Sequence, residues 1–400
     1  MDVLPDEQEV EIRDAARTFL EAECPTSLVR AAERSPGGLD RRLWSAMSEL
    51  GWTGASLRAD VGGQELPLTV TGLLLAEAGR HLAPVPLLSS TVAALMVDRY
   101  GTTQQRQLAA DVAAGRAIAT YALVGPTGSI ACLPDAALTA VRVGDELELS
   151  GTMSFVDAAD VADWLLVAAR DESGQLSVLI VGTDLSGLSV QPLVSTAKDR
   201  QGKVTFDRVR VPLAAELGPS GAGAAVLEDV FQHAVALLCA QIGGAARKDM
   251  ELAVAYAKQR HAFGRPIGSF QALQHLCADM LLQVDGIELL AAEAIWRLSD
   301  GQPANVEVSQ AKAFAAEHAI AVCRASQQIH GGIGFMLEFD LQLWYRRIAS
   351  WCLRLGGAPE HRARVAAALL DTSESRAPVR LGEPLSRPVS GAVSGLWHVG

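Results

Sequence analysis

Aromatic and cationic residues are scarce in this sequence. Aromatic residues make up 5% of its 400 residues, although 49% are hydrophobic, and Ala, Leu and Val dominate the apolar set, as is typical of packed helices. The formal net charge is -12. Because phosphate binding needs clustered Lys and Arg, this balance argues against a nucleic-acid partner, and it also argues against binding to an anionic membrane surface. A local group of arginines could still bind a small anionic ligand.

Signals for secretion and membrane insertion are also missing. The stretch MDVLPDEQEVEIRD at the N-terminus has no basic region followed by an apolar core, so no signal peptide is predicted. No apolar run reaches the roughly 18 residues that span a bilayer. Six scattered cysteines form no C-x-x-C motif, and we interpret them as small buried hydrophobes. We expect a cytoplasmic protein without a metal site.

Familiar catalytic spacings are absent as well. The sequence contains no G-x-S-x-G, no H-E-x-x-H, no Walker loop and no G-x-G-x-x-G after a predicted strand. What remains is a set of glycine-bearing loops at predicted helix ends, each of which carries Arg, Gln or His. A nucleophilic or metal-dependent enzyme is therefore poorly supported.

Hydrophobic periodicity divides the chain into three parts and a tail, and the fold class is α+β. Residues 1–116 predict amphipathic helices. Residues 117–222 consist of short β-branched runs, and R-V-G-D-E-L-E-L indicates a hairpin, so we expect a small antiparallel β-domain. Residues 223–372 return to long helices whose apolar spacing is typical of a bundle. Residues 373–400 are rich in Pro, Ser and Gly and predict a flexible tail.

Two loops in the C-terminal block suit a phosphate-bearing ligand. The first, RHAFGRPIGSFQ at 260–271, offers guanidinium groups that pair with phosphate oxygens, the start of a helix, and Phe263 as an apolar face for a heterocycle. Read alone, it is equally well explained as a turn with solvated arginines. The second, QQIHGGIGF at 327–335, places two glycines after a helix, where backbone can approach a ligand or simply cap the helix.

Taken together, the two loops carry a family resemblance. The motifs R-x-x-F-G-x-x-I-x-x-F-Q and Q-x-x-G-G-x-G-F follow each other roughly sixty residues apart on an α–β–α chain. In this order they closely resemble the acyl-CoA dehydrogenase family, over about residues 5–370. The stretches FGRPIGSFQALQHLCADM and HGGIGFMLEFDLQLWYRR look like the actinobacterial branch, whose members often work as unlike pairs of subunits.

The resemblance implies an N-terminal helical domain, a middle β-domain and a C-terminal four-helix bundle, assembled as dimers or as dimers of dimers. It also implies an FAD with its isoalloxazine between the β-domain and the bundle. By family position, Arg260 would contact the pyrophosphate, Phe263 would pack near the adenine, and Gln271 would hydrogen-bond close by. The diphosphate would also meet a second set that the partner subunit provides, namely Gln328, Gly331 and Gly332.

The implied reaction is the α,β-desaturation of an acyl thioester in lipid metabolism. A carboxylate removes the α-proton, and the β-hydrogen leaves as hydride to the flavin. The acyl group would be carried by CoA or by a carrier protein, with steroid side-chain intermediates as one candidate class. Electron-transfer flavoprotein is the usual electron acceptor of the family.

Both family positions for the catalytic glutamate are apolar in this chain. Counted without gaps from Gly331, one position falls at Leu355, and counted back from Phe263 the other falls at Ala234. Neither side chain can take a proton. The ionisable residues nearby are better explained as first-turn helix carboxylates or as a packed histidine, and they are Glu228, Asp229, His233 and Glu360.

The predicted β-domain departs from the family too. The family's T-E-P-x-A-G-S-D loop corresponds to LVGPTGSIA, so that Val124 and Gly125 replace Thr and Glu. On the strand expected to face the flavin, Phe155 and Asp157 take the usual Trp and Thr positions. An anion at Asp157 would disfavour reduced anionic flavin unless the carboxyl were neutral or paired.

Three interpretations follow. The chain is a subunit, for example of a heterotetramer, that gives half of a shared FAD site to an unlike partner supplying the base. Alternatively, it is a self-sufficient flavoenzyme with a displaced base, such as Asp229 or Glu228, or with altered chemistry such as oxygenation or action on a carrier-protein thioester. Or it is a non-catalytic scaffold that has kept the fold.

Overall fold

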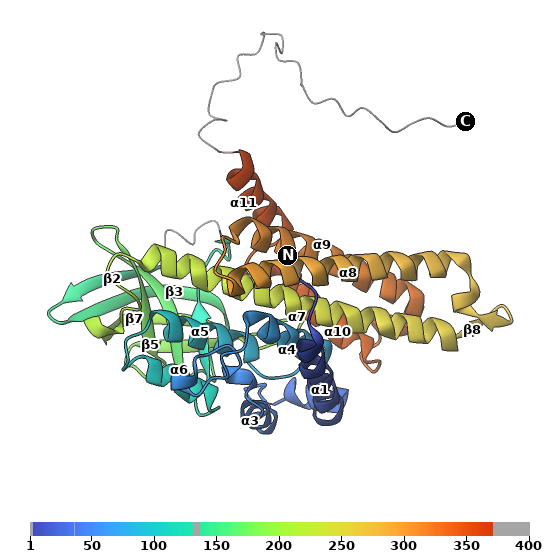
Figure 1. Ribbon diagram of the computed structural model, residues 1–400, viewed down its shortest axis with the longest axis horizontal. Coiled ribbons are helices and arrows are strands. Elements are labelled where there is room, and N and C mark those ends of the chain that lie inside the picture. Colours follow the sequence, from blue (N-terminus) through green and yellow to red (C-terminus); the bar gives the residue numbers. More distant parts are fainter. Residues whose placement is uncertain (1–2, 36, 131–136, 371–400) are drawn as a thin grey trace, which may run out of the picture.

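The computed structural model describes residues 3–35, 37–130 and 137–370 (Figure 1). The helix expected after Pro5 begins at a capping box, because the Asp6 side chain accepts a hydrogen bond from the Glu9 amide at 2.8 Å and the Glu9 side chain accepts one from the Asp6 amide at 3.0 Å. The helices before the sheet are α1 (Glu7–Glu23), α2 (Thr26–Ala32), α3 (Arg41–Glu49), α4 (Leu68–Arg80), α5 (Leu87–Tyr100) and α6 (Arg106–Ala113), with short 3-10 turns at Trp52–Gly54 and Ala59–Val61.

The middle of the chain forms one sheet. Its strands are β1 (Ala119–Ala122), β2 (Leu138–Val143), β3 (Glu146–Asp157), β4 (Trp164–Asp171), β5 (Leu176–Gly182), β6 (Leu188–Leu193) and β7 (Gln201–Pro212), ordered β1-β4-β2-β3-β7-β6 with β5 also on β4. The expected hairpin is present, since Val143 lies opposite Glu146 in the antiparallel β2–β3 pair. Unlike the expectation of a purely antiparallel sheet, β4 runs parallel to both β1 and β2. Neither pair is joined by a tight turn, and only a tight turn forces strands to run antiparallel.

Long helices follow the sheet: α7 (Gly223–Gln259), α8 (Gln271–Ser299), α9 (Asn305–His330), α10 (Leu341–Leu353) and α11 (Ala358–Leu370). Short turns at Leu213–Ala215, Ile267–Ser269 and Gly331–Phe335 and a hairpin of β8 (His261–Ala262) and β9 (Arg265–Pro266) connect them. Figure 1 shows α7, α8 and α9 side by side, running from the sheet to the β8–β9 hairpin at the far end of the molecule. With 37 residues, α7 is about 55 Å long. The order of helices, sheet and helices confirms the expected α+β architecture.

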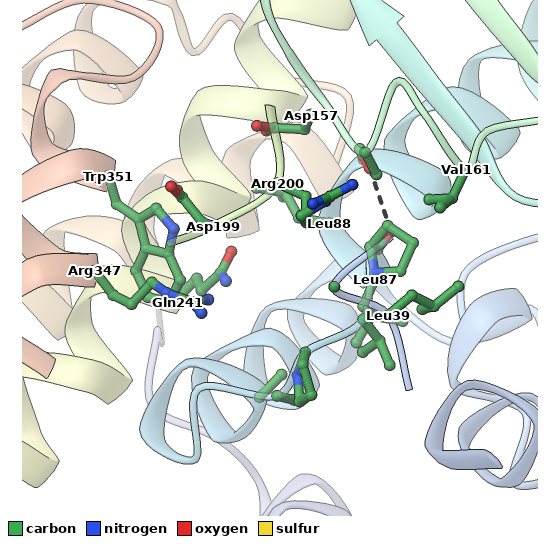
Figure 2. Close-up of a pocket in the computed structure, with 18 of the residues that line it drawn as sticks. Leu39, Leu87, Leu88, Asp157, Val161, Asp199, Arg200, Gln241, Arg347 and Trp351 are labelled. Atoms are coloured by element: carbon green, nitrogen blue, oxygen red, sulfur yellow. Dashed lines mark hydrogen bonds between the residues drawn. The ribbon is translucent and has the colours of Figure 1, made fainter. Parts of the chain in front are cut away.

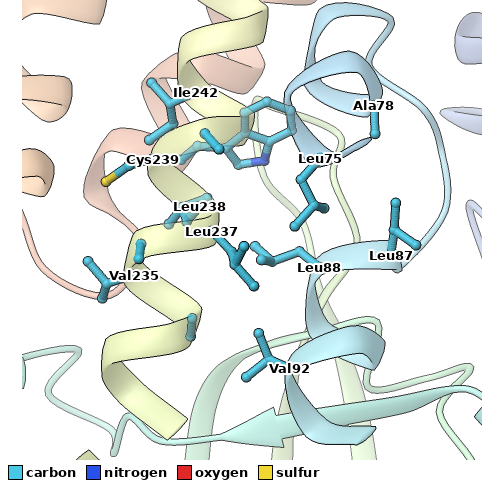
Figure 3. Packing of buried hydrophobic residues seen from close by; sticks show 14 of the residues in the cluster. Leu75, Ala78, Leu87, Leu88, Val92, Val235, Leu237, Leu238, Cys239 and Ile242 are labelled. Carbon is cyan, nitrogen blue, oxygen red and sulfur yellow. The ribbon is translucent and has the colours of Figure 1, made fainter. Parts of the chain in front are cut away.

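Helix α7 runs through the hydrophobic core. It is long and apolar enough to cross a membrane by composition, but 67% of its most apolar window is buried within this chain. Figure 3 shows Leu237 of α7 pointing toward Leu88 of α5, near Leu75 of α4, while Val235 and Ile242 of the same cluster project from the other side of α7. This shared core packs the N-terminal helices against the bundle and fixes their relative positions.

The described cysteines fit the expectation of packed thiols. Five of them are free, and four of the five are buried. Cys132 and the predicted tail at 373–400 lie outside the described residues.

Candidate active site

A cavity of about 100 Å³ lies where the N-terminal helices, the β-domain and the bundle meet. Figure 2 shows Asp157, Asp199 and Arg347 around one part of it, with Leu39, Leu87 and Val161 on the opposite side. The cavity is therefore polar toward the sheet and α10, and apolar toward the N-terminal helices. Its remaining polar lining residues include Arg200, Gln241 and Arg354.

An ion cluster at this cavity joins the bundle to the β-domain. Arg354, the residue after α10, places one guanidinium nitrogen 3.1 Å from Asp157 at the end of β3 and forms an ion pair with Asp199 in the loop before β7. The three side chains are nearly buried, with exposed fractions of 10%, 13% and 8% for Arg354, Asp157 and Asp199. Gln201 donates a further hydrogen bond to Asp157 at 3.1 Å.

The two carboxyl groups titrate in opposite directions. Burial raises the pKa of Asp157 to about 6, although the charge of Arg354 acts to lower it. Burial also acts to raise the pKa of Asp199, but Arg354 and Arg347 outweigh it, so that this pKa lies below its usual range. Asp199 is thus the firmly ionised partner of Arg354, while Asp157 is the group that can take up a proton near neutral pH.

Further contacts of α10 secure the same junction. Arg347 donates to the carbonyl of Ala197 at 2.8 Å, and Arg346 donates to the carbonyl of Thr196 at 2.8 Å and pairs with Glu33 at 3.0 Å. Ser350 donates to Asp199 at 3.1 Å. Residues of α10 therefore hold a β-domain loop and the N-terminal helical region together next to the cavity.

The two expected base positions are buried in apolar surroundings. Ala234 is fully buried in the middle of the core that α7 forms, and Leu355 is 7% exposed. Leu355 also has φ = +55°, a left-handed conformation that is costly for a residue with a Cβ. Neither position offers a carboxylate to the cavity, as the sequence indicates.

The weak candidates for a displaced base lie elsewhere. Glu228, Asp229 and His233 line a separate cavity of about 590 Å³ together with Arg99 and Arg364. Asp229 accepts from Arg99 at 2.7 Å, from Tyr100 at 2.8 Å and lies 3.0 Å from the His233 ring nitrogen Nδ1.

These contacts determine the protonation of Asp229. Burial acts to raise its pKa, but the hydrogen bond from His233 and the charge of Arg99 outweigh burial and hold the pKa well below its usual range. Such a carboxylate is a poor proton acceptor. Glu360 lies in the first turn of the last helix, as expected, and accepts from the Gly357 amide at 3.1 Å and from Ser129 at 2.9 Å.

The six residues expected to hold FAD from the bundle are all exposed, and they are Arg260, Phe263, Gln271, Gln328, Gly331 and Gly332. They surround the far end of the bundle, which we call the bundle tip. Phe263 is 94% exposed and has φ = +53°, so the β8–β9 hairpin holds its ring out from the chain in a strained conformation. A Cβ added at Gly331 or Gly332 would meet no atom within 4 Å, which leaves the backbone of this turn open to a ligand.

The structure places both tip loops on one chain, and the assignment of their residues to one or the other subunit stays a prediction. Tyr256, near the end of α7, stacks on His330, the last residue of α9, with ring centroids 4.5 Å apart. Both loops therefore lie at the same end of one chain, because α7 and α9 run in the same direction. The sequence alone does not give the relative direction of two helices separated by a third.

The bundle tip and the cavity belong to different sites. Gln241 lines the cavity, and Arg260 follows it by nineteen residues on the same helix, about 28 Å away along the axis. Phe155, half exposed on β3, and Asp157 lie at the sheet end of the molecule. One chain therefore cannot bring its own tip residues to its own cavity.

FAD fits these two places differently. At the tip, the exposed guanidinium of Arg260, the open glycine turn and the projecting ring of Phe263 suit a diphosphate and a flat heterocycle. The cavity does not fit the flavin ring, since about 100 Å³ is well below the roughly 300 Å³ at which ligand pockets begin. Arg354 lines this cavity, and its Nε is buried without a hydrogen-bond partner among the described residues, so the cavity suits a bound water molecule.

Sequence reasoning missed Arg354 and Asp199. The only signal was an arginine within the otherwise apolar stretch ASWCLRLGG, directly before the family base position. Asp199 lies in an unremarkable polar loop, and nothing in the sequence pairs it with a residue 155 positions later.

Comparison with known proteins agrees with this fold. The family models described as the acyl-CoA dehydrogenase N-terminal and C-terminal domains match residues 6–116 and 221–370. The acyl-CoA dehydrogenase IpdE2 of Mycolicibacterium smegmatis is 30% identical over 88% of this chain and 96% of its own length. The chain belongs to the acyl-CoA dehydrogenase family, whose members are FAD-dependent oxidoreductases.

Two examples illustrate the solved structures that are similar over nearly the whole chain. One is the ChsE4-ChsE5 complex from Mycobacterium tuberculosis, with a TM-score of 0.87 and 27% identity over 93% of this chain and 100% of the matched chain. The other is a steroid acyl-CoA dehydrogenase, Tcur3481-Tcur3483, with a TM-score of 0.85 and 31% identity over 91% of this chain and 98% of the matched chain.

Proposed function

We propose that this chain is a subunit of a heteromeric acyl-CoA dehydrogenase and that an unlike, homologous partner supplies the catalytic glutamate. The observation that carries the proposal is a contrast between the two sites. Both base positions, Ala234 and Leu355, are apolar and buried. The residues of the bundle tip that suit a phosphate-bearing ligand are exposed. A chain that can bind FAD but has no base for the α-proton of the substrate needs a partner that supplies one.

In this assembly the bundle tip completes the FAD site of the partner. Arg260 would pair with the diphosphate, the backbone at Gly331 and Gly332 would approach it, and Gln271 and Gln328 would add hydrogen bonds. Phe263 would pack against the adenine end. Bound FAD supplies the acceptor for the β-hydrogen of the substrate. The side chains that this chain adds would balance the charge of the diphosphate and orient the FAD. The carboxylate of the partner would take the α-proton of the substrate.

The relatives support an unlike partner and a bulky substrate. The ChsE4-ChsE5 complex joins two differently named proteins, and Tcur3481-Tcur3483 is a steroid acyl-CoA dehydrogenase. We propose a CoA or carrier-protein thioester of a polycyclic acyl group as substrate, a heterotetramer as assembly, electron-transfer flavoprotein as acceptor, and the cytoplasm as location.

The test is to produce this chain alone and together with a homologue from the same organism that carries the glutamate. The pair is expected to copurify, to retain FAD and to desaturate an acyl-CoA, whereas this chain alone is inactive. Arg260→Ala in the pair should lower FAD retention, while Lys258→Ala, which removes an exposed charge from the same helix end, should not. Unchanged FAD content in Arg260→Ala would show that the tip assignment is wrong.

A second candidate is a self-sufficient flavoenzyme with a displaced base. Asp157 favours it, because this carboxyl lines the cavity and burial raises its pKa to about 6. If the chain alone bound FAD and turned over an acyl thioester, and Asp157→Asn abolished that turnover, this candidate would replace the first. A pair that forms without any effect of this chain on flavin or turnover would leave only the scaffold role.

A further inference from the structure

The side chain of Arg354 lines the cavity of this chain. The arginine extends from the bundle, just after α10, to two carboxylates on the β-domain, Asp157 at 3.1 Å and Asp199. Any flat ring inserted between the sheet and the bundle at this level would have to separate these charges. Because all three side chains are nearly buried, separation would leave Asp157 without a counter-charge and Asp199 with only the charge of Arg347.

The surroundings of Arg354 keep it in this place. Asp199 is held by Ser350 of α10 at 3.1 Å and by Ser195 at 3.0 Å, and Arg347 reaches the carbonyl of Ala197 in the same loop. Arg354 therefore meets a loop that is already fixed to α10 by independent contacts. Because these contacts fix Asp199, they also fix the guanidinium of Arg354 that pairs with it.

We propose that Arg354 is the residue that closes this chain's own cavity to the flavin ring, so that only the cavity of the partner holds FAD. This inference rests on the proposed pairing with an unlike subunit and gives that pair a stoichiometry of one FAD for each two chains. The bundle tip of this chain serves the occupied site, while its own cavity serves as a fixed junction between domains. Arg354 thus determines which of the two sites in a pair is a flavin site.

The experiment measures FAD per pair of chains in the copurified complex, by quantifying released FAD against protein and by native mass spectrometry. Wild type is expected to give one FAD per pair. Arg354→Ala combined with Asp157→Asn removes the guanidinium and one of its two carboxylates, and is expected to raise the ratio toward two. Arg346→Ala is the matched control, because it removes another α10 arginine that contacts the β-domain but does not line the cavity. That control should stay at one FAD.

Each outcome decides something. Two FAD per wild-type pair would overturn the inference and leave the proposed pairing intact, whereas failure of the two chains to associate would count against the proposed function itself. A folded, paired double variant that stays at one FAD would show that another feature closes the cavity. If the double variant does not fold, the inference is tested on wild type, since saturating the pair with free FAD should not add a second equivalent.

Discussion

Removing the buried guanidinium of Arg354 should destabilise the chain in a pH-dependent way. Arg354→Ala leaves Asp157 and Asp199 without their shared partner in a nearly buried setting. Breaking a buried ion pair by deleting one member costs about 3–5 kcal/mol. We expect a loss of unfolding free energy in this range at pH 8.

The pH dependence follows from the protonation of Asp157. Its pKa is about 6 with Arg354 present, and it must lie higher without that positive charge. Above pH 6 the folded variant therefore keeps a proton that folded wild type has lost, so the variant loses about 1.4 kcal/mol of stability relative to wild type per pH unit until its own pKa is reached. The penalty should therefore shrink as the pH falls toward 6 and level off below it, where both folded forms carry the proton.

Urea denaturation of wild type, Arg354→Ala, Asp157→Asn and the double variant at several pH values tests this reasoning. The double variant should lose less stability than Arg354→Ala, and its difference from Asp157→Asn should not depend on pH in this range. A loss below about 1 kcal/mol, or one that is constant from pH 5 to pH 8, would refute the account of a coupled buried cluster.

Three further predictions concern other parts of the chain. Burial raises the pKa of Asp249 to about 8, so the unfolding free energy should fall by about 1.4 kcal/mol per pH unit between about pH 4 and pH 8. Asp249→Asn should remove this slope in denaturant titrations. Equal slopes in the two proteins would contradict the assignment of a protonated Asp249 carboxyl. Gly244→Ala places a Cβ against the backbone of Ala76, so it should cost about 3 kcal/mol or more of stability in thermal unfolding. Gly332→Ala, whose Cβ points into open space, should cost less than about 0.5 kcal/mol. Similar losses in the two variants would show that the α4–α7 contact can relax. Phe263→Asn should relieve about 1 kcal/mol of backbone strain while lowering FAD retention in the complex, and undiminished retention would remove Phe263 from the site.

The architecture was readable from the sequence because its signals are local. Met280, Val284 and Ile287 recur at helical spacing, and the structure buries all three on one face of α8. The G-D turn between alternating runs likewise predicts the β2–β3 pair, since two-residue turns fix both direction and register. Such patterns depend only on residues a few positions apart.

The site was harder to read because its contacts are remote in sequence. Asp157, Asp199 and Arg354 come from a strand end, a loop and the residue after a helix, and each looks ordinary in its own segment. The shared position of the two tip loops depends on helix direction, which periodicity does not record. The absence of a glutamate at Ala234 and Leu355, by contrast, could be read directly once the family motifs supplied a register.

The central claim is that this chain completes the flavin site of an unlike partner. Its most direct test is to titrate the purified chain into a glutamate-bearing homologue and to follow acyl-CoA-dependent bleaching of the flavin absorbance together with retained FAD. The account predicts that both rise and level off at one chain per partner chain, and that Arg260→Ala prevents the rise while Lys258→Ala does not. A partner that binds FAD and bleaches at full rate alone, unchanged by this chain, would contradict it.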